Sequence, residues 1–379
     1  MKKTISIVCV VTLIVGIGLV EAADVFDMPT GLTSLKTVTV GNPNNAGEWS
    51  GSSGDSYTSA ERICGAVSYE YNIGKYEVTA AQYTEFLNAV ATTDPYGLYN
   101  SDMWSSSHGC KILRLGSSGS YTYSVGLSAY ANHPVNYVSW GDAARFANWL
   151  TNGQGNGSTE TGAYNLGVAT TNEALMAVAV PTAVQRETWS NGVKPYFLLT
   201  SEDEWYKAAY YTTDLDKNGT HDDPGYYDYP TSSDTIPGYV NNSGNLSGTG
   251  DPFTEDGTDP GNYATYDGDG VIDGIGSPYW CTEVAEWENS DSPYGTFDQG
   301  GNVWEWNEAI IKAGKYRGLR GGSFTGVDFA LHASFRPAQT ATMEDYTLGF
   351  RVSEVPEPAT LTLLTLGGLA ILRRRRGGR

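Results

Sequence analysis

Cysteine and histidine, the side chains that most often carry nucleophilic, redox or metal chemistry, are few and scattered in this sequence. The four histidines are His108, His133, His221 and His332. No two of them have the spacing of a helical metal-binding pair, and no cysteines have zinc-ligand spacing. A Ser-His-Asp hydrolase stays open on residue types alone, but no nucleophile elbow supports it. The sequence therefore points neither to a zinc enzyme nor to an iron enzyme.

Side chains that offer oxygen ligands are far more numerous, and one loop groups them at short spacing. The segment from Asp214 to Asp222 reads DLDKNGTHD and matches an EF-hand-like calcium loop at positions 1, 3, 5, 6 and 9. Position 12, however, is Gly225, where a bidentate glutamate is expected. The pattern is typical either of a weak calcium loop or of a solvated turn.

The overall charge also favours the binding of metal cations. The chain has 43 acidic and 23 basic residues and a formal net charge of −20. Seven of the basic residues lie at the two ends, so the body is more acidic still: Lys2, Lys3, Arg373 to Arg376 and Arg379. Such a body repels nucleic acid and anionic lipid, and it favours divalent cations. We therefore exclude nucleic-acid binding.

Three helices can be predicted from capping residues that are followed by apolar residues at helical spacing. We expect them to begin after Thr79, after Ser139 with Asp142 three residues on, and after Ser201 with Glu204 three residues on. The rest of the chain is rich in glycine and aromatic residues, which predicts a loop-rich globular domain with few long helices.

Three stretches outside these helices read as irregular. Residues 96–130 and 152–195 are rich in Gly, Ser and Thr and predict surface loops, the second with a short helix near Asn172 to Val180. Residues 212–279 show no periodicity. A run this long without its own elements needs internal support, for which metal ions are candidates.

Five segments carry a family resemblance. Gly300 to Trp306 reads GGNVWEW, and the segment from Leu319 to Val352 begins LRGGSF and ends LGFRV. Upstream blocks in the same order are Ile73 to Phe86, His133 to Leu150 and Leu198 to Ala209. Together they resemble the formylglycine-generating enzyme, or sulfatase-modifying factor, family over residues 38–352. The resemblance implies one α+β domain with the formylglycine-generating-enzyme fold, a C-type-lectin-like variant that is loop-rich with few long helices.

The same resemblance raises a question about chemistry. Oxidases of that family carry two copper-binding cysteines shortly after the GGS turn, whereas here Gly321-Gly322-Ser323 is followed by none, because the last cysteine is Cys281. We therefore expect neither copper nor cysteine oxidation. The resemblance also implies that the next segment lines a ligand groove, with plain core packing as the alternative. The candidate groove residues are Phe324, Asp328, His332, Phe335 and Arg336.

Calcium and buried ion pairs are further implications. By matching positions, the resemblance implies one calcium ion held by Asp298, the carbonyls of Gly301 and Val303, and Glu305; bracing of a turn by these carboxylates is the alternative. A second ion is implied at Asn262 and Tyr263 with an acidic partner among Asp267, Asp269 and Asp273. The arginines of this region are expected to be buried partners of carboxylates: Arg320, Arg336 and Arg351.

The two ends resemble sorting signals. Residues 1–23 have a basic start, an apolar run and small residues, which predicts an export signal. Residues 354–379 resemble a PEP-CTERM tail: Pro356-Glu357-Pro358, an apolar stretch and four arginines. That resemblance implies sorting by an exosortase to the envelope, outer surface or extracellular matrix of a Gram-negative bacterium; a simple transmembrane anchor is the alternative. The domain is then expected at residues 24–353.

Export also bears on the cysteines. Without Cys9, which lies in the signal, three cysteines remain, so at most one pair can form. A Cys64–Cys110 disulfide and three reduced, buried cysteines are both open.

We thus expect an exported, surface-sorted protein that is not a catalyst. It would bind a glycan or peptide ligand and contain structural calcium. The alternatives are a formylglycine-generating oxidase acting on exported sulfatases and a structural matrix protein without a specific ligand.

Overall fold

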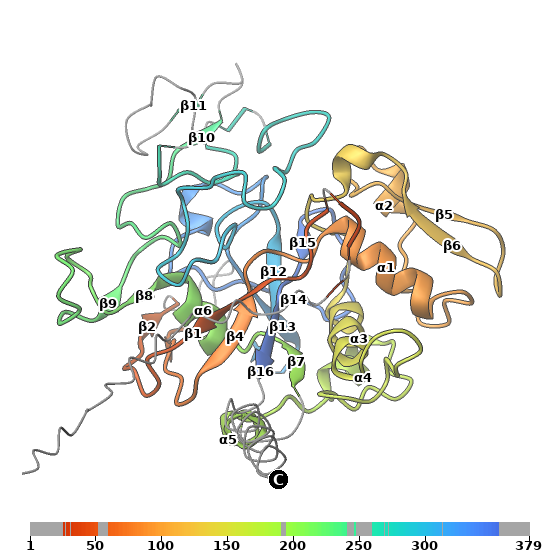
Figure 1. The fold of residues 1–379 in the computed structure, drawn as a ribbon, viewed down its shortest axis with the longest axis horizontal. Coiled ribbons are helices and arrows are strands. Elements are labelled where there is room, and N and C mark those ends of the chain that lie inside the picture. The colour runs from red at the N-terminus through yellow and green to blue at the C-terminus, as the bar shows by residue number, and fades with distance from the viewer. Residues whose placement is uncertain are drawn as a thin grey trace, which may run out of the picture.

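The computed structural model describes residues 26–355, apart from 27, 31, 52–59, 191–194, 241–245, 248–259, 269, 272 and 313 (Figure 1). The helices are α1 (Ala80–Val90), α2 (Asp102–Ser105), α3 (Trp140–Thr151), α4 (Asn172–Met176), α5 (Ala183–Trp189) and α6 (Glu202–Tyr210). The strands are β1 (Thr37–Val40), β2 (Glu48–Ser50), β3 (Arg62–Cys64), β4 (Tyr71–Gly74), β5 (Ile112–Leu115), β6 (Thr122–Val125), β7 (Tyr196–Leu199), β8 (Tyr211–Thr212), β9 (Gly225–Tyr226), β10 (Tyr239–Val240), β11 (Leu246–Ser247), β12 (Trp304–Ile311), β13 (Tyr316–Arg320), β14 (Ala338–Gln339), β15 (Leu348–Gly349) and β16 (Val352–Val355).

Two four-stranded sheets organise the domain. One has the strand order β1-β4-β16-β7 and is antiparallel throughout, and the other has the order β14-β13-β12-β15. Strand β16 lies between β4 and β7, so the end of the domain pairs with segments from its first and middle thirds. It ends two residues beyond the boundary expected at residue 353. The short helices and separate sheets agree with the expected α+β class.

The three predicted helix starts are confirmed. Thr79 caps α1, Ser139 caps α3 and Ser201 caps α6, each through a complete capping box. Helix α3 is buried on every side rather than on one stripe. It lies against β7 in the main core (Figure 1), where rings from α1 and α3 pack with Phe350.

The predicted surface loops contain more structure than expected. Residues 96–130 include α2 and the β5–β6 hairpin, and their Met103, Ile112 and Tyr123 are core residues. Their apolar side chains complete the core beside α1, which the Gly/Ser/Thr content of the segment obscured. The expected short helix near residues 172–180 is α4, and α5 follows it. Within residues 212–279, the described elements are only two-residue strands.

The cysteine alternatives resolve in favour of free thiols. Cys64, Cys110 and Cys281 are all buried and unpaired by disulfides in the structure. The proposed Cys64–Cys110 bridge is therefore not formed.

The buried arginines are paired with carboxylates, as predicted. Glu202 receives Arg320 at 2.8 Å and Arg336 at 2.6 Å, and Glu305 receives Arg351 at 2.6 Å. Each of these side chains is nearly or completely buried. The pairs link α6 to β13 and β12 to the segment before β16, so they fix the relative positions of helix and sheets.

No helix in the described part of the chain is both long and apolar enough to cross a membrane. The predicted export signal and the apolar part of the tail lie outside the described residues.

The pairing around Glu202 makes a prediction about acid stability. Burial alone would raise the pKa of Glu202, but the charges of Arg320, Arg336 and Arg62 outweigh it and lower the pKa to about 2. Because an unfolded glutamate has a pKa of roughly 4.3, this carboxylate contributes stability above that pH, and the contribution is lost as the pH falls through the folded value.

We therefore expect Glu202→Gln to lower the free energy of unfolding by about 3 kcal/mol at neutral pH, since it leaves arginines unpaired. In urea denaturation, the difference in the free energy of unfolding between Glu202→Gln and the wild type should become smaller as the pH falls from about 4 to 2. The control is Glu85→Gln on the exposed side of α1, which should change stability by less than about 0.5 kcal/mol. A Glu202→Gln protein as stable as wild type at neutral pH would contradict the pairing.

Candidate functional site

Two of the predicted groove residues are buried. The Phe324 side chain is completely inaccessible and packs with Cys281 and Val303. Arg336 donates from Nε to Glu202 Oε1 at 2.6 Å and from Nη2 to Glu202 Oε2 at 2.7 Å. The expectation that these two line a groove is therefore wrong, because each has a partner from a distant part of the chain.

The remaining three predicted groove residues are at or near the surface. Asp328 begins a short 3-10 turn and accepts from the backbone of Phe329. His332 Nε2 lies 3.4 Å from Asp228 Oδ1, and its Nδ1 accepts from the backbone N–H of Ser334 at 3.0 Å. These contacts orient the imidazole without burying it.

The third of them, Phe335, belongs to a group of rings. Its ring centroid lies 5.9 Å from that of Trp304 and 5.2 Å from that of Phe329. Phe329 is 55 % exposed and was not among the predicted residues. An aromatic residue in a turn carries no sequence signal that separates an exposed ring from a core one. We call the face formed by Phe329, His332 and Phe335 with Trp304 the aromatic face.

None of the three thiols in the domain is activated as a thiolate. Burial raises the pKa of Cys281 well above its ordinary value, and the nearby Glu77 charge adds to the shift. Burial likewise raises the pKa of Cys64 and that of Cys110 to about 11. At neutral pH these groups are thiols rather than the thiolates that react and bind copper.

The first predicted calcium set is grouped around one buried glutamate. Glu305 Oε2 accepts from Trp205 Nε1 at 2.7 Å, and Arg351 binds both of its carboxylate oxygens at 2.6 Å. Asp298 Oδ2 accepts from the backbone of Ala285 at 2.7 Å. The bracing role that was left as the alternative is thus present for both carboxylates.

A third carboxylate, which the sequence analysis missed, lies at the same place. Glu77 accepts from the Asn302 amide and from the backbone N–H of Val303, both at 3.2 Å. Burial and the charges of Asp298 and Glu305 raise the pKa of Glu77 well above its usual range. Burial, together with the Glu305 charge, raises the pKa of Asp298 to about 6.

The charges here do not balance. Three carboxylates, Glu77, Asp298 and Glu305, interact with the single guanidinium of Arg351. An excess of carboxylate oxygens in a low-dielectric site is the donor set that a hard cation such as calcium prefers. The turn that contains Gly301 and Val303 thus offers the ligand types that calcium takes, but Glu77, Asp298 and Glu305 are not all close enough to one another to share one ion in this structure.

The second predicted calcium set shows no such grouping. Asn262 Oδ1 accepts from Thr231 Oγ1 at 2.6 Å, and Asp267 Oδ1 accepts from the backbone N–H of Gly270 at 2.8 Å. Tyr263 is buried against Trp287. Asp273 is half-buried, and Asp269 lies outside the described residues.

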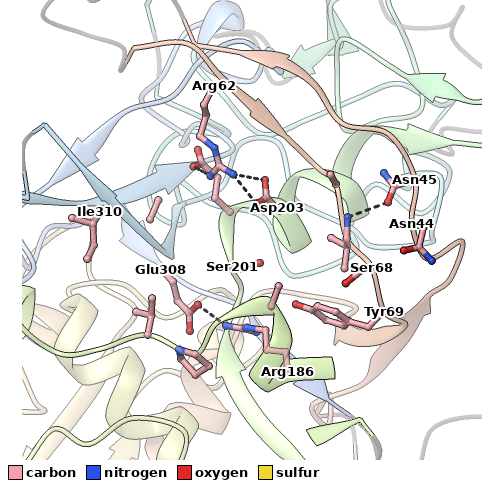
Figure 2. Close-up of a pocket in the computed structure, with 17 residues that line it drawn as sticks. Asn44, Asn45, Arg62, Ser68, Tyr69, Arg186, Ser201, Asp203, Glu308 and Ile310 are labelled. Carbon is pink, nitrogen blue, oxygen red and sulfur yellow. Dashed lines mark hydrogen bonds and ion pairs between the residues drawn. The ribbon is translucent and has the colours of Figure 1, made fainter. Parts of the chain in front are cut away.

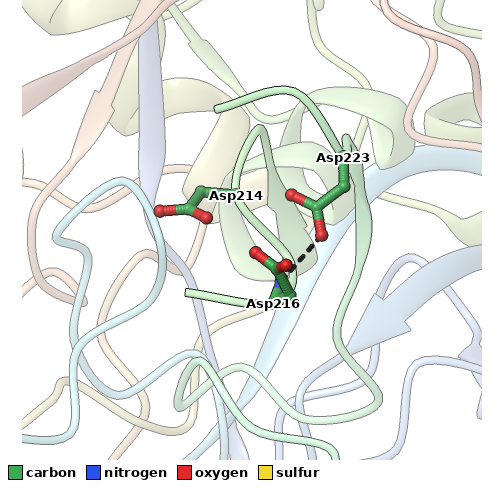
Figure 3. Close-up of side chains that lie close together, drawn as sticks. All are labelled: Asp214, Asp216 and Asp223. Carbon is green, nitrogen blue, oxygen red and sulfur yellow. Dashed lines mark hydrogen bonds between the residues drawn. The ribbon is translucent and has the colours of Figure 1, made fainter. Parts of the chain in front are cut away.

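The EF-hand-like loop brings together three aspartates, but they are not the three that its spacing suggested. Asp214 and Asp216 lie beside Asp223, as Figure 3 shows, rather than beside Asp222. Among the residues that the structure describes, this is the one group of three or more His, Cys, Asp and Glu side chains close enough to share a metal ion. Asp214 and Asp223 also accept hydrogen bonds from backbone N–H groups of the loop, so the trio equally fits the solvated turn.

A cavity of about 610 Å³ lies near the start of α6 and the end of β12 (Figure 2). Ion pairs form part of its wall: Arg62 is 2.7 Å from Asp203, and Arg186 is 2.5 Å from Glu308. None of the predicted site residues lines it. Because these charges neutralise one another, the cavity gives no clear preference for an ionic ligand.

Comparison with known proteins supports the fold and both resemblances. The model of the sulfatase-modifying factor enzyme 1-like domain matches residues 65–355, and that of the PEP-CTERM protein-sorting motif matches residues 354–376. The sorting motif implies an exported protein that is sorted at the envelope by an exosortase. No curated protein sequence matches the chain.

Three solved structures have a similar backbone. Treponema denticola variable protein 1 is 19% identical with a TM-score of 0.47, over 87% of this chain and 98% of the other. CarF is 18% identical with a TM-score of 0.43, over 84% and 97%. PvdO from Pseudomonas aeruginosa is 14% identical with a TM-score of 0.43, over 85% and 94%.

The domain model covers most of the chain, and the structure has the loop-rich α+β architecture that the sequence blocks implied. The protein belongs to the sulfatase-modifying factor enzyme 1-like family.

Proposed function

We propose that this protein binds a glycan or peptide ligand at the cell envelope or in the extracellular matrix of a Gram-negative bacterium and does not oxidise cysteine. One observation carries the proposal. The segment after Gly321-Gly322-Ser323 contains no cysteine, and the thiols of the domain are buried and protonated at neutral pH. A copper-dependent oxidase needs two thiolates that reach the same metal ion.

The aromatic face is the surface we assign to the ligand. Phe329 and Phe335 meet edge to face, and Phe335 contacts Trp304, so the rings support one another while Phe329 remains open to solvent. Exposed rings can stack on sugar rings or on peptide side chains. Asp328 and His332 at the edge supply polar groups that can select an orientation.

Calcium is proposed as a structural ion. It would be held by Asp298, Glu305 and the carbonyls of Gly301 and Val303, with Glu77 close by. The uncompensated carboxylates at this turn support the proposal. The ion would supply positive charge there, and the turn leads directly into β12, which contains Trp304 of the aromatic face.

The oxidase alternative can be tested directly. We expect no formylglycine when the purified domain is incubated with copper, oxygen and a sulfatase peptide that contains the target cysteine. Mass spectrometry of the peptide is the measurement, and an active formylglycine-generating enzyme is the positive control. Formation of formylglycine above the enzyme-free background would reject the proposal.

The binding surface can be tested on glycan and peptide arrays. Phe329→Ala and Phe335→Ala should each weaken binding to any ligand that the wild type retains by about 10-fold, because each removes a ring worth roughly 1 to 1.5 kcal/mol. The matched control is Trp104→Ala, which removes an exposed ring from α2. Equal binding by all variants would rule out the aromatic face. An array on which the wild type binds nothing would favour the structural matrix protein.

Calcium binding predicts a change in thermal stability. Calcium at about 100 times its dissociation constant should stabilise the domain by roughly 2.7 kcal/mol, and a chelator should reverse the effect. Asp298→Ala should abolish the shift in melting temperature. The combined variant Asp214→Asn, Asp216→Asn and Asp223→Asn should keep it. If Asp298→Ala keeps the shift in melting temperature and the triple variant loses it, the ion is bound by the 214–223 loop instead. If calcium does not change the melting temperature of the wild type, the domain has no structural calcium.

A further inference from the structure

Four aromatic side chains from separate segments of the chain contact one another in succession. The centroid of the Trp280 ring lies 4.4 Å from that of His108, and the His108 centroid lies 4.9 Å from that of Tyr346. Tyr137 follows, with its centroid 6.4 Å from that of Tyr346. The buried ring of Phe324 supports them from inside, 5.9 Å from His108 and 6.0 Å from Tyr346. None of these residues belongs to the aromatic face.

Three of these side chains are reached by solvent. His108, Trp280 and Tyr346 are half-buried, whereas Tyr137 and Phe324 are buried. We call His108, Trp280 and Tyr346 the ring platform. Partly exposed rings that contact one another form a surface on which the apolar face of a ligand can stack, and a succession of rings offers more than one stacking position.

The ring platform is held in place by hydrogen bonds to the backbone of its loops. The buried side chain of Asn136 donates from Nδ2 to the carbonyl oxygens of His108 at 2.7 Å and of Tyr346 at 2.8 Å. Trp280 is fixed separately, because its indole N–H donates to the carbonyl oxygen of Ser107 at 3.1 Å. The rings are thus arranged before any ligand arrives, which reduces the entropy that binding would cost.

The backbone is strained at two of the four rings. The φ angle is +65° at Trp280 and +58° at Tyr137, in the left-handed region that bulky side chains rarely adopt. Such conformations persist only where the surrounding structure imposes them, and they are concentrated at ligand-binding and catalytic sites. Here both strained residues direct a ring into the same aromatic group.

The polar groups beside the ring platform are mainly acidic. Asp345 directly precedes Tyr346 in the chain. Burial raises the pKa of Tyr346, and the charges of Asp345 and Asp273 add to the rise, so both carboxylates lie near this ring. The neighbouring base, Lys111, donates instead to the carbonyl oxygen of Ser106. Carboxylates accept hydrogen bonds from hydroxyl groups and repel anions. The platform therefore suits a ligand with hydroxyl groups and no negative charge.

A sugar meets these requirements better than a peptide does. One face of a sugar ring carries C–H groups that can stack on an aromatic ring, while the hydroxyls at its edge can reach carboxylate oxygens. His108, Trp280 and Tyr346 all lie in turns rather than in strands. The platform therefore does not present the strand edge with which an extended peptide pairs.

We propose that the ring platform binds a neutral glycan, whose sugar rings stack on Trp280, His108 and Tyr346 and whose hydroxyls donate to Asp345 and Asp273. This is a second site, which goes beyond the proposed function. It shares no residue with the aromatic face, and it does not depend on whether that face binds a ligand.

The test is calorimetric titration of the purified protein with two pairs of hexasaccharides. Cellohexaose is compared with the β-1,4-glucuronate hexamer, and β-1,4-mannohexaose with the β-1,4-mannuronate hexamer. Each acidic probe keeps the linkage of its neutral partner and carries a carboxylate on every sugar. At least one neutral hexamer should bind, and its acidic partner should bind about 10-fold more weakly, because the carboxylates beside the platform repel it.

Variants locate the binding. Trp280→Ala and Tyr346→Ala should each weaken binding of the neutral hexamer by about 10-fold, because each removes a stacking surface. Trp280→Phe keeps a ring at the same position and should lose less affinity than Trp280→Ala. The matched control is Trp49→Ala, which removes a tryptophan that is 68 % exposed on β2 and should change affinity by less than about 2-fold. Circular dichroism identifies the variants that are folded.

The charge selection has its own variant. Asp345→Asn is nearly isosteric and leaves the rings in place. It should reduce the difference in affinity between the neutral hexamer and its acidic partner by about 3-fold, because one repelling charge is removed.

Two results would overturn the proposal. One is that neither neutral hexamer binds, or that a neutral hexamer binds no more tightly than its acidic partner. The other is that folded Trp280→Ala and Tyr346→Ala proteins keep the wild-type affinity. If Phe329→Ala weakens binding of the hexamer while these two variants do not, the glycan is bound by the aromatic face, which supports the proposed function and rejects the second site.

Discussion

The rest of the structure depends on buried ion pairs that join helix α6 to the two sheets. The pairs are Glu202 with Arg320 and Arg336, Glu204 and Glu308 with Arg186, and Glu305 with Arg351. An ionised carboxylate in a protein interior costs several kcal/mol unless a partner and hydrogen bonds satisfy it. These groups can therefore be buried together only when helix and sheets take one relative position. Two of these arginines also donate to loop carbonyls, Arg320 to those of Ala333 and Phe335 and Arg351 to that of Phe297, so these loops are held in the same frame.

The same pairing decides which residues remain for binding. Arg336 lies in the segment that resembles the reactive region of the oxidases, but both of its bonds to Glu202 are made inside the protein. Phe324 is likewise committed to packing with Cys281. The part of the segment that reaches solvent is the turn around Phe329. The proposed ligand binding is therefore assigned to this turn and not to the buried Phe324 and Arg336.

Other buried polar groups lack such compensation. Glu77 and Asp298 share one guanidinium with Glu305, which leaves an excess of negative charge beside the turn that precedes β12. In this first case a cation would supply the missing charge. The Nδ1 of His133 is also buried, and it has no hydrogen-bond partner among the described residues. Both sites adjoin the loop 281–288, since Ala285 bonds Asp298 and Val284 bonds the residue before His133.

The sequence by itself determined the family, the α+β class and the starts of the three main helices, because caps such as Thr79 and its partner Gln82 act over three residues. It also indicated that the arginines are internal. The β5–β6 hairpin was missed, since four-residue strands among Gly, Ser and Thr leave no clear periodicity.

Only the tertiary structure decided the burial of Phe324, the contribution of Glu77 and the burial of His133. Each of these depends on partners more than 30 residues away in the chain. Local pattern has no information about such pairings, because it is the packing of distant segments that removes water from a side chain and chooses its neighbours.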